Sequence, residues 1–249
     1  MAIIITVSNR KGGVAKTTTA VTLAHGLALK GKRVLVVDID PQGHVAPSLG
    51  LKRGPGMFDL IMEKRSLASV VQRARDRLWI VPGNQRTATA ENMLVYEQRK
   101  VDALQKPLSN GLTGDLDYLI FDTPPGSVGA LQQFALFMSD LVLIPASVDA
   151  LSERGIVDVL EELQGLKNDH GWRGGLLGIL PTFFDDVTKN SRVGLAGLQE
   201  NLIDLVLPPI HRATVLRDCS REGKTVFDLD QVNRSTKEYA ALVWRVLDG

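Results

Sequence analysis

The chain has 249 residues, of which 44% are hydrophobic and 23% charged, and its formal net charge is +1 at pH 7. This length and apolar content suit one globular α/β domain over residues 1–249. Because basic residues barely outnumber acidic ones, any binding of nucleic acid would need a local basic patch.

The single cysteine, Cys219, excludes an intramolecular disulfide and cannot alone supply a cysteine-based zinc or iron–sulfur site. The apolar run at residues 2–7 lacks the charged flank and the length of a signal sequence. No stretch reaches the roughly 18 uninterrupted apolar residues that are typical of a membrane span. We therefore expect a cytoplasmic protein with no membrane partner.

Six short runs of consecutive apolar residues predict strands covered on both faces, as in a parallel sheet. They cover residues 3–7, 33–37, 78–81, 118–121, 141–144 and 176–180. Helical spacing alternates with them, first over residues 17–30 and most clearly over 152–166. Residues 84–115 are predicted to form a mostly helical segment that ends in the loop SNGLTG. This alternation predicts a doubly wound, mostly parallel α/β sheet with ligands beyond the carboxyl ends of its strands.

The first predicted strand runs into NRKGGVAKTT, residues 9–18, and then into a helix. In this context backbone N–H groups and the positive end of the helix converge on an anion. Lys16 would reach the terminal phosphates, and the Thr17 hydroxyl would join a Mg²⁺ shell. The pattern G-x-x-x-x-G-K-[ST] nevertheless fails at Arg10 and Ala15. Since a left-handed conformation costs an alanine roughly 1–2 kcal/mol, we expect a negative φ at Ala15. The alternative is a glycine-rich turn with solvated lysines.

Carboxylates follow two further predicted strands. RVLVVDIDPQG places Asp38 and Asp40 at the end of the second strand, and YLIFDTPPG places Asp122 at the end of another. Any one of them could be a cap or turn former. Three carboxylates grouped beside a triphosphate would repel it unless a metal lay between, so together they favour a metal–nucleotide site.

The segments KGGVAKTT, VVDIDPQG and IFDTPPG resemble the ParA/MinD family of deviant Walker-box ATPases. The resemblance covers nearly the whole chain, with further support from LIPASVDALSERG, ILPTFF and LPPIHRA. It implies a P-loop NTPase fold that binds ATP and Mg²⁺. It also identifies Lys11 as the family's signature lysine, which reaches the ATP of the other subunit in an ATP-bound homodimer. The loop residues implied to contact nucleotide are Lys11, Gly12, Gly13, Val14, Ala15, Lys16, Thr17 and Thr18.

The same resemblance implies roles for the carboxylates. Asp40 would orient or activate the attacking water and so join Lys11 and Lys16 as a catalytic residue. Asp38 and Asp122 would act with Thr17 around Mg²⁺, largely through water.

Three later residues, Thr182, Phe183 and Pro208, match positions that flank the adenine in this family. For Phe183 a place in the core is an equally good interpretation, because aromatic residues at strand ends are usually buried. Ala15 replaces the glycine more common in the family, which bears on loop geometry and hydrolysis rate more than on binding.

Several branches of the family do not fit. Iron-protein reductases and cluster scaffolds need paired cysteines, and tyrosine-kinase relatives carry a C-terminal tyrosine cluster, whereas this chain has one cysteine and three tyrosines. A MinD-like membrane-surface ATPase needs a basic amphipathic C-terminal helix. STKEYAALVWRVLDG has only Lys237 and Arg245 as basic residues, so we expect a helix that packs in the core and keep the MinD-like function as an alternative.

The hypothesis that remains is a small ParA-type ATPase that positions a plasmid, chromosome region or large cytoplasmic cargo over the nucleoid. It would bind nonspecific DNA as an ATP dimer, and an adaptor or activator protein would stimulate hydrolysis. Since the loop begins at residue 9, we expect no helix-turn-helix extension before it. A second alternative is an ATP-dependent small-molecule ligase on the same fold. The candidate DNA contacts are Lys189, Arg192, Arg212, Arg217, Arg221, Lys224, Arg234 and Lys237; a solvated surface is an equally good interpretation of them.

Overall fold

The computed structural model describes residues 2–109, 116–126, 129–148 and 152–248. One seven-stranded sheet runs through these residues in the order β3-β4-β2-β5-β1-β6-β7. Its strands are β1 (Ile3–Val7), β2 (Val34–Asp38), β3 (Gln72–Arg75), β4 (Leu78–Val81), β5 (Tyr118–Asp122), β6 (Leu141–Ser147) and β7 (Gly175–Thr182). Neighbouring strands pair in parallel except at the β3–β4 edge, so the predicted mostly parallel sheet is confirmed.

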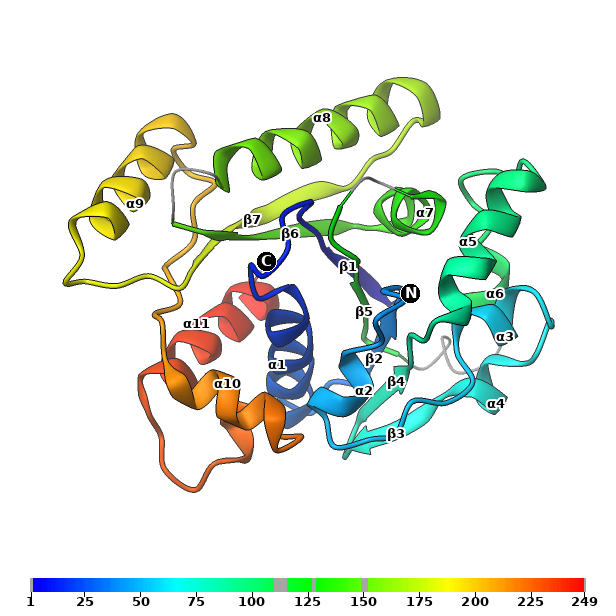
Figure 1. Cartoon of the computed structure of the whole chain (residues 1–249), viewed down its shortest axis with the longest axis horizontal. Coiled ribbons are helices and arrows are strands. Elements are labelled where there is room, and N and C mark those ends of the chain that lie inside the picture. Colours follow the sequence, from blue (N-terminus) through cyan, green and yellow to red (C-terminus); the bar gives the residue numbers. More distant parts are fainter. Residues whose placement is uncertain (1, 110–115, 127–128, 149–151, 249) are drawn as a thin grey trace.

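Helices cover both faces of the sheet (Figure 1). They are α1 (Lys16–Leu29), α2 (Val45–Ser48), α3 (Met57–Ile61), α4 (Leu67–Val70), α5 (Arg86–Tyr96), α6 (Gln105–Ser109), α7 (Ala130–Met138), α8 (Ser152–His170), α9 (Lys189–Asn201), α10 (Thr214–Arg221), the 3₁₀ turn η2 (Val226–Asp228) and α11 (Arg234–Asp248). Alternate β2 residues belong to different cores: Val34 and Val36 pack with α1 and α11, while Leu35 packs with α3, α4 and α7. This double coverage explains why the central strands are apolar at consecutive positions.

The antiparallel edge strand β3 is not among the six predicted strands. Its sequence, QRAR, has no apolar run, because one face of an edge strand stays near solvent. The predicted helical excursion over residues 84–115 contains α5 and α6 among the described residues. Most of its terminal loop SNGLTG lies outside the residues that the structure describes.

The C-terminal helix α11 packs in the core, as predicted, and it lies against α1. Its buried apolar side chains, Leu242, Val243 and Val246, belong to the same core as the α1 residues Leu23 and Leu27. Trp244 faces outward and is half exposed, with the Lys30 ammonium 4.4 Å from its ring centroid. No helix within the described residues is long and apolar enough to cross a membrane.

Candidate nucleotide-binding site

The sheet register gathers the candidate residues at one edge. Asp38 at the end of β2 pairs with Asp122 at the end of β5, and Asp122 pairs with Val7 at the end of β1. The loop after β1 therefore starts beside both carboxylates. Parallel strands place their carboxyl ends together, and ligands of doubly wound folds bind there.

The loop between β1 and α1 folds tightly around its two glycines and Lys16. Gly13 has a φ of 70°, and a Cβ built there would meet no other atom within 4 Å. Gly12 faces Pro125 of the loop after β5, and a Cβ on it would lie 3.7 Å from the Pro125 Cβ. The Lys16 ammonium donates to the Lys11 carbonyl at 3.0 Å and so folds back over the loop. Burial lowers the pKa of Lys16, while Asp122 and Asp40 oppose this shift.

The expectation of a negative φ at Ala15 is wrong. Ala15 is left-handed, with φ 65° and ψ 29°, and directly precedes α1. Its carbonyl accepts the Thr19 N–H at 2.9 Å, which is the first bond of the helix. The turn from loop to helix requires this conformation, so the alanine carries a strain of about 1–2 kcal/mol that glycine would avoid.

Two buried carboxylates lie next to the loop. Neither Asp38 nor Asp122 has exposed surface. Burial raises the pKa of Asp38 to about 7. The pKa of Asp122 is raised well above its usual range, first by burial and then by the nearby Asp38. Thr17 donates its hydroxyl to Asp122 Oδ2 at 2.7 Å, which opposes that shift.

These groups fit a magnesium ion. Asp122 Oδ1 is buried and has no hydrogen-bond partner among the described residues. A hard divalent cation accepts carboxylate and hydroxyl oxygens and would favour the ionised carboxylates that burial opposes. Within the same described ranges no three His, Cys, Asp or Glu side chains form a ready metal cluster. The arrangement thus suits an ion held jointly by Thr17, waters and a phosphate ligand.

Asp40 lies in a tight turn immediately after β2. Its Oδ1 accepts the Gln42 N–H at 2.8 Å, and its own N–H donates to Asp38 Oδ1 at 3.0 Å. The turn packs so closely on the loop after β4 that a Cβ on Gly83 would lie 2.4 Å from the Asp40 carbonyl oxygen. Asp40 is buried, with 6% of its surface exposed, and the Gln42 N–H orients its carboxylate.

Lys11 lies on the outer side of the loop. Its ammonium donates to Ser147 Oγ at the end of β6, at 3.2 Å, and its N–H donates to Asn9 Oδ1 at 2.8 Å. A Cβ on Gly155 of α8 would lie 3.5 Å from the Lys11 Cβ. Lys11 and Lys16 therefore have different surroundings. Lys16 is buried beside carboxylates, whereas Lys11 is half-buried beside β6 and α8.

The three predicted adenine neighbours lie on two segments that run side by side, the end of β7 and the segment that contains Pro208. Thr182 lies against the loop and donates its hydroxyl to the Val14 carbonyl at 3.3 Å. Phe183 follows with a φ of 55°, its ring 5.8 Å from the Arg212 guanidinium carbon, and is only partly buried. Pro208 instead lines a cavity of about 140 Å³ together with Leu180 and residues of α11.

The candidate basic residues are spread over several surfaces. Arg217 and Arg221 are exposed on α10, while Lys189 and Arg192 begin α9. Arg234, at the start of α11, forms ion pairs with Asp186 and Glu238, both at 2.9 Å. The structure thus brings part of the set together around α10 and gives Arg234 a structural role in an ion-pair network.

Sequence reasoning missed Asn9 and Ser147, which hold the outer side of the loop. Asn9 Nδ2 also donates to the Pro145 carbonyl at 2.8 Å. The two β6 residues that bond the loop, Pro145 and Ser147, each lie 136 residues after their partners, so no local pattern could have revealed these contacts. The only signal was the position of Asn9 at the entrance to the loop.

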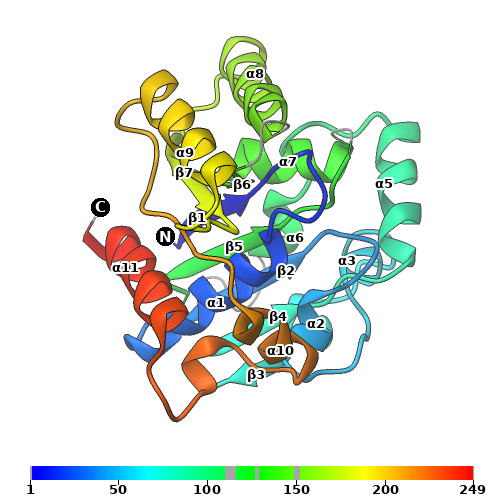
Figure 2. The same ribbon diagram turned by 60° about the vertical axis from the view of Figure 1, so that its left-hand side comes forward.

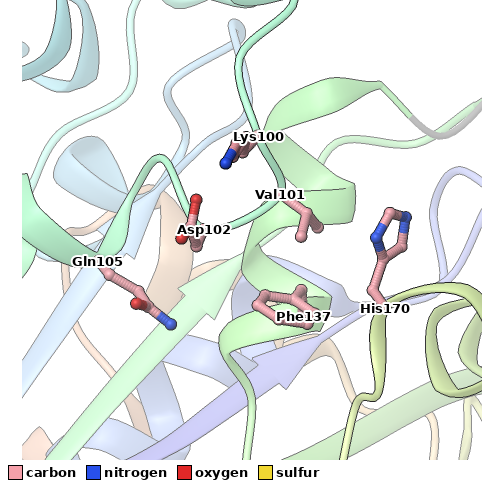
Figure 3. A pocket seen from close by; sticks show the side chains of 6 residues that line it. All are labelled: Lys100, Val101, Asp102, Gln105, Phe137 and His170. Atoms are coloured by element: carbon pink, nitrogen blue, oxygen red, sulfur yellow. The ribbon is translucent and has the colours of Figure 1, made fainter.

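A second hollow has a volume of about 330 Å³ and lies away from the candidate nucleotide site (Figure 3). Phe137 near the end of α7 and His170 at the end of α8 line it with residues of the connection between α5 and α6. These elements end just before β6 and β7 begin, so the hollow is at the amino ends of the strands. No predicted site residue lines it.

The fold and the loop define the class of protein as a P-loop nucleoside triphosphatase. A family model described as "AAA domain" matches residues 2–171. The chain is 31% identical to the chromosome partitioning protein ParA of Myxococcus xanthus (strain DK1622), over 96% of this chain and 86% of that protein. The chain belongs to the ParA/MinD family of partition ATPases.

Several solved structures match 99% of the chain, and two of them represent different proteins. Apo McdA from Cyanothece superposes with a TM-score of 0.88 at 22% identity over 100% of that chain, which shows the shared fold. Cobyrinic acid a,c-diamide synthase from Mycobacterium smegmatis, with bound ATP analogue and magnesium, has a TM-score of 0.84 at 28% identity over 95% of that chain.

Proposed function

We propose that residues 1–249 act as one ParA-type ATPase domain that positions a plasmid, a chromosome region or a large cytoplasmic cargo. ATP with Mg²⁺ drives it into a homodimer that binds nonspecific DNA, and hydrolysis releases it. The observation that carries this proposal is the meeting of Lys16 in the loop with three carboxylates at one edge of the sheet. Family membership supports the ATPase activity.

The loop binds the phosphates of ATP. Its backbone N–H groups and the N-terminus of α1, a helix of 14 residues, present positive charge to the anion. Lys16 leaves the Lys11 carbonyl and turns to the terminal phosphates, where a charge-assisted bond is stronger than a neutral one. Thr17, Asp38 and Asp122 would act around Mg²⁺, the two carboxylates largely through water, and the ion would neutralise charge on the phosphates.

Asp40 positions the attacking water. The Gln42 N–H fixes the orientation of its carboxylate, and a carboxylate in hydrogen-bond reach of water orients it or accepts its proton. Lys11 stabilises charge on the phosphates of the neighbouring subunit's ATP. Release of phosphate removes this contact and weakens the dimer, which links nucleotide state to association.

The DNA matrix and the partner complete the cycle. The exposed basic residues around α10 bind phosphates by counterion release, and dimerisation doubles their number. An adaptor or activator protein stimulates hydrolysis. The protein is then cytoplasmic and nucleoid-associated.

Sedimentation of the wild type with ADP and with ATP plus Mg²⁺, in the absence and presence of nonspecific duplex DNA, tests this function. We expect a dimer only with ATP, and co-sedimentation of that dimer with DNA. Asp40→Ala should accumulate the ATP dimer, whereas Lys11→Ala should bind ATP but stay monomeric. A wild-type monomer in every nucleotide state, or equal dimerisation of Lys11→Ala and wild type, would refute the proposal for Lys11.

A second candidate is an ATP-dependent small-molecule ligase. The likeness to the diamide synthase, at 28% identity over nearly the whole chain, favours it. Steady ATP turnover without any added small molecule, accelerated by DNA, would exclude this candidate. Turnover that requires an added carboxylic acid and an amine donor would support it.

A further inference from the structure

A polar cluster away from the nucleotide site joins three segments that are distant in sequence. Arg75 on β3 is its centre: its guanidinium donates to both carboxylate oxygens of Asp228, each at 3.1 Å. It also donates to the Gly223 carbonyl at 2.9 Å and the Leu49 carbonyl at 3.0 Å. Leu49 directly follows α2, and Gly223 comes two residues after α10. One side chain therefore holds the carboxyl ends of both helices.

The two helices also meet through their backbones. A Cβ built on Gly223 would lie 2.4 Å from the Gly50 Cα, so only glycine allows this approach. Both glycines are left-handed, with φ of 75° at Gly50 and 70° at Gly223. The hydroxyls of Ser48 and Ser220 lie 3.1 Å apart across the same contact. Because the two helix ends are close-packed, a displacement of the end of α2 moves the end of α10.

The opposite end of α2 reaches the nucleotide site. The Val45 N–H at the start of the helix donates to Asp38 Oδ2 at 3.1 Å. A four-residue helix is about 6 Å long, so one turn separates this buried carboxylate from the contact with Gly223. Figure 2 shows α2 beside α10, below the central strands.

The helix that begins at the phosphate loop touches the same segment. His25 of α1 is 4% exposed, and its Nδ1 lies 2.7 Å from Thr225 Oγ1. Thr225 N–H in turn donates to Asp228 Oδ2 at 2.8 Å. The chain that follows α10 is thus packed against both helices, α1 and α2, that start at the nucleotide site.

We propose that α2 relays the state of the nucleotide site to α10 and that Arg75 is the positioning residue of this relay. A shift of the Asp38 carboxylate on ATP binding moves α2 as a unit, and α10 follows through the Gly50–Gly223 contact that Arg75 holds in place. Since α10 carries Arg217 and Arg221, the relay controls the basic surface, and this part rests on the proposed function.

Amide hydrogen exchange of residues 214–224, with and without a non-hydrolysable ATP analogue and Mg²⁺, tests the relay. In the wild type we expect exchange in this segment to change on nucleotide binding, and in Arg75→Ala the change should disappear while nucleotide affinity stays within about threefold. Arg73→Ala is the matched control, because Arg73 lies on the same strand with a side chain that is 65% exposed and pairs with Asp76. It should behave as the wild type.

The relay would be overturned if nucleotide did not change the amide exchange of residues 214–224 in the wild type. It would also be overturned if folded Arg75→Ala showed the same exchange response as the wild type. If Arg75→Ala does not fold, Arg75→Lys serves instead, because an ammonium keeps the charge but cannot bridge Asp228 and two carbonyls in the same plane.

DNA binding separates the two proposals. With duplex DNA as the probe, Arg75→Ala should bind about tenfold more weakly in the presence of ATP, a typical size for coupling between sites. Wild type that shows the exchange response but no DNA binding would refute the DNA matrix and leave the relay supported. DNA binding without the exchange response would refute the relay alone.

Discussion

Two charged regions of the molecule are built in opposite ways. At the carboxyl edge of β1, β2 and β5, Asp38 and Asp122 have no exposed surface; backbone N–H groups hold Asp38, and the Thr17 hydroxyl holds Asp122. Around α10, the Arg217 side chain is 71% exposed and lies 3.7 Å from Asp218. A buried charge is costly unless it has a partner, whereas an exposed ion pair contributes little.

This contrast separates two kinds of recognition. In the proposed function the edge binds one ligand in one orientation, so each side chain there is expected to matter individually. The α10 surface would attract phosphate by accumulated charge, so its residues are expected to matter as a group and to lose effect in salt. The relay through α2 connects the two regions.

The largest effect should come from Lys16→Ala. Its ammonium is the buried cation of the loop, and loss of a charge-assisted hydrogen bond costs about 1.5–3 kcal/mol, or about 10- to 100-fold in affinity. Titration with a fluorescent ATP analogue measures this. Lys30→Ala, at the exposed end of the same helix, is the control and should retain wild-type affinity. Equal affinities for the two variants would remove Lys16 from the site.

Replacing Arg217 and Arg221 together by alanine should weaken ATP-dependent DNA binding while leaving ATP affinity unchanged. Each lost phosphate contact should reduce the slope of log K against log salt by about 0.9. Fluorescence anisotropy with duplex DNA over a salt series gives this slope. The control is Arg99→Ala, on an exposed segment after α5. A slope unchanged from wild type would place the DNA surface elsewhere.

His25 gives the buried cluster a pH dependence. Burial lowers the pKa of His25, with Asp228 acting in the opposite direction. The unfolded chain therefore binds a proton more readily below about pH 6.5, and the His25 contribution to stability is lost as pH falls through that range, by at most about 1.4 kcal/mol per pH unit. Urea unfolding of wild type and His25→Asn across this range should show a smaller pH dependence in the variant. Parallel curves would contradict it; His170→Asn, at an exposed position, is the control.

The smallest effect should follow Ala15→Gly. Glycine relieves a left-handed strain of about 1–2 kcal/mol but adds about 0.4–1 kcal/mol of unfolded-state entropy, so the melting temperature should rise by about 1–3 °C. Differential scanning calorimetry of the nucleotide-free protein measures it. Ala196→Gly, at an exposed position inside α9, should instead lower the melting temperature, because glycine destabilises a helix interior. A lower melting temperature for Ala15→Gly would mean that the strain is absent.

Much of the nucleotide edge was predictable. Asp38, Asp40 and Asp122 follow strands, and parallel strands carry their carboxyl ends to one edge, so spacing along the chain predicted their meeting. The adenine side was less predictable. Thr182 lies against the loop, but Pro208 belongs to a segment that packs along β7 toward α11, and no local pattern shows where such a segment runs.

The sequence by itself determined the alternation of the parallel strands with helices, the glycine-rich loop before α1 and the carboxylates beside it, because these follow from short-range spacing and the rules of parallel sheets. Only the tertiary structure decided the left-handed Ala15, the Lys11 contact with Ser147 and the Arg75 cluster. Such contacts join residues up to about 150 positions apart, and they depend on how helices close over the sheet rather than on any local preference.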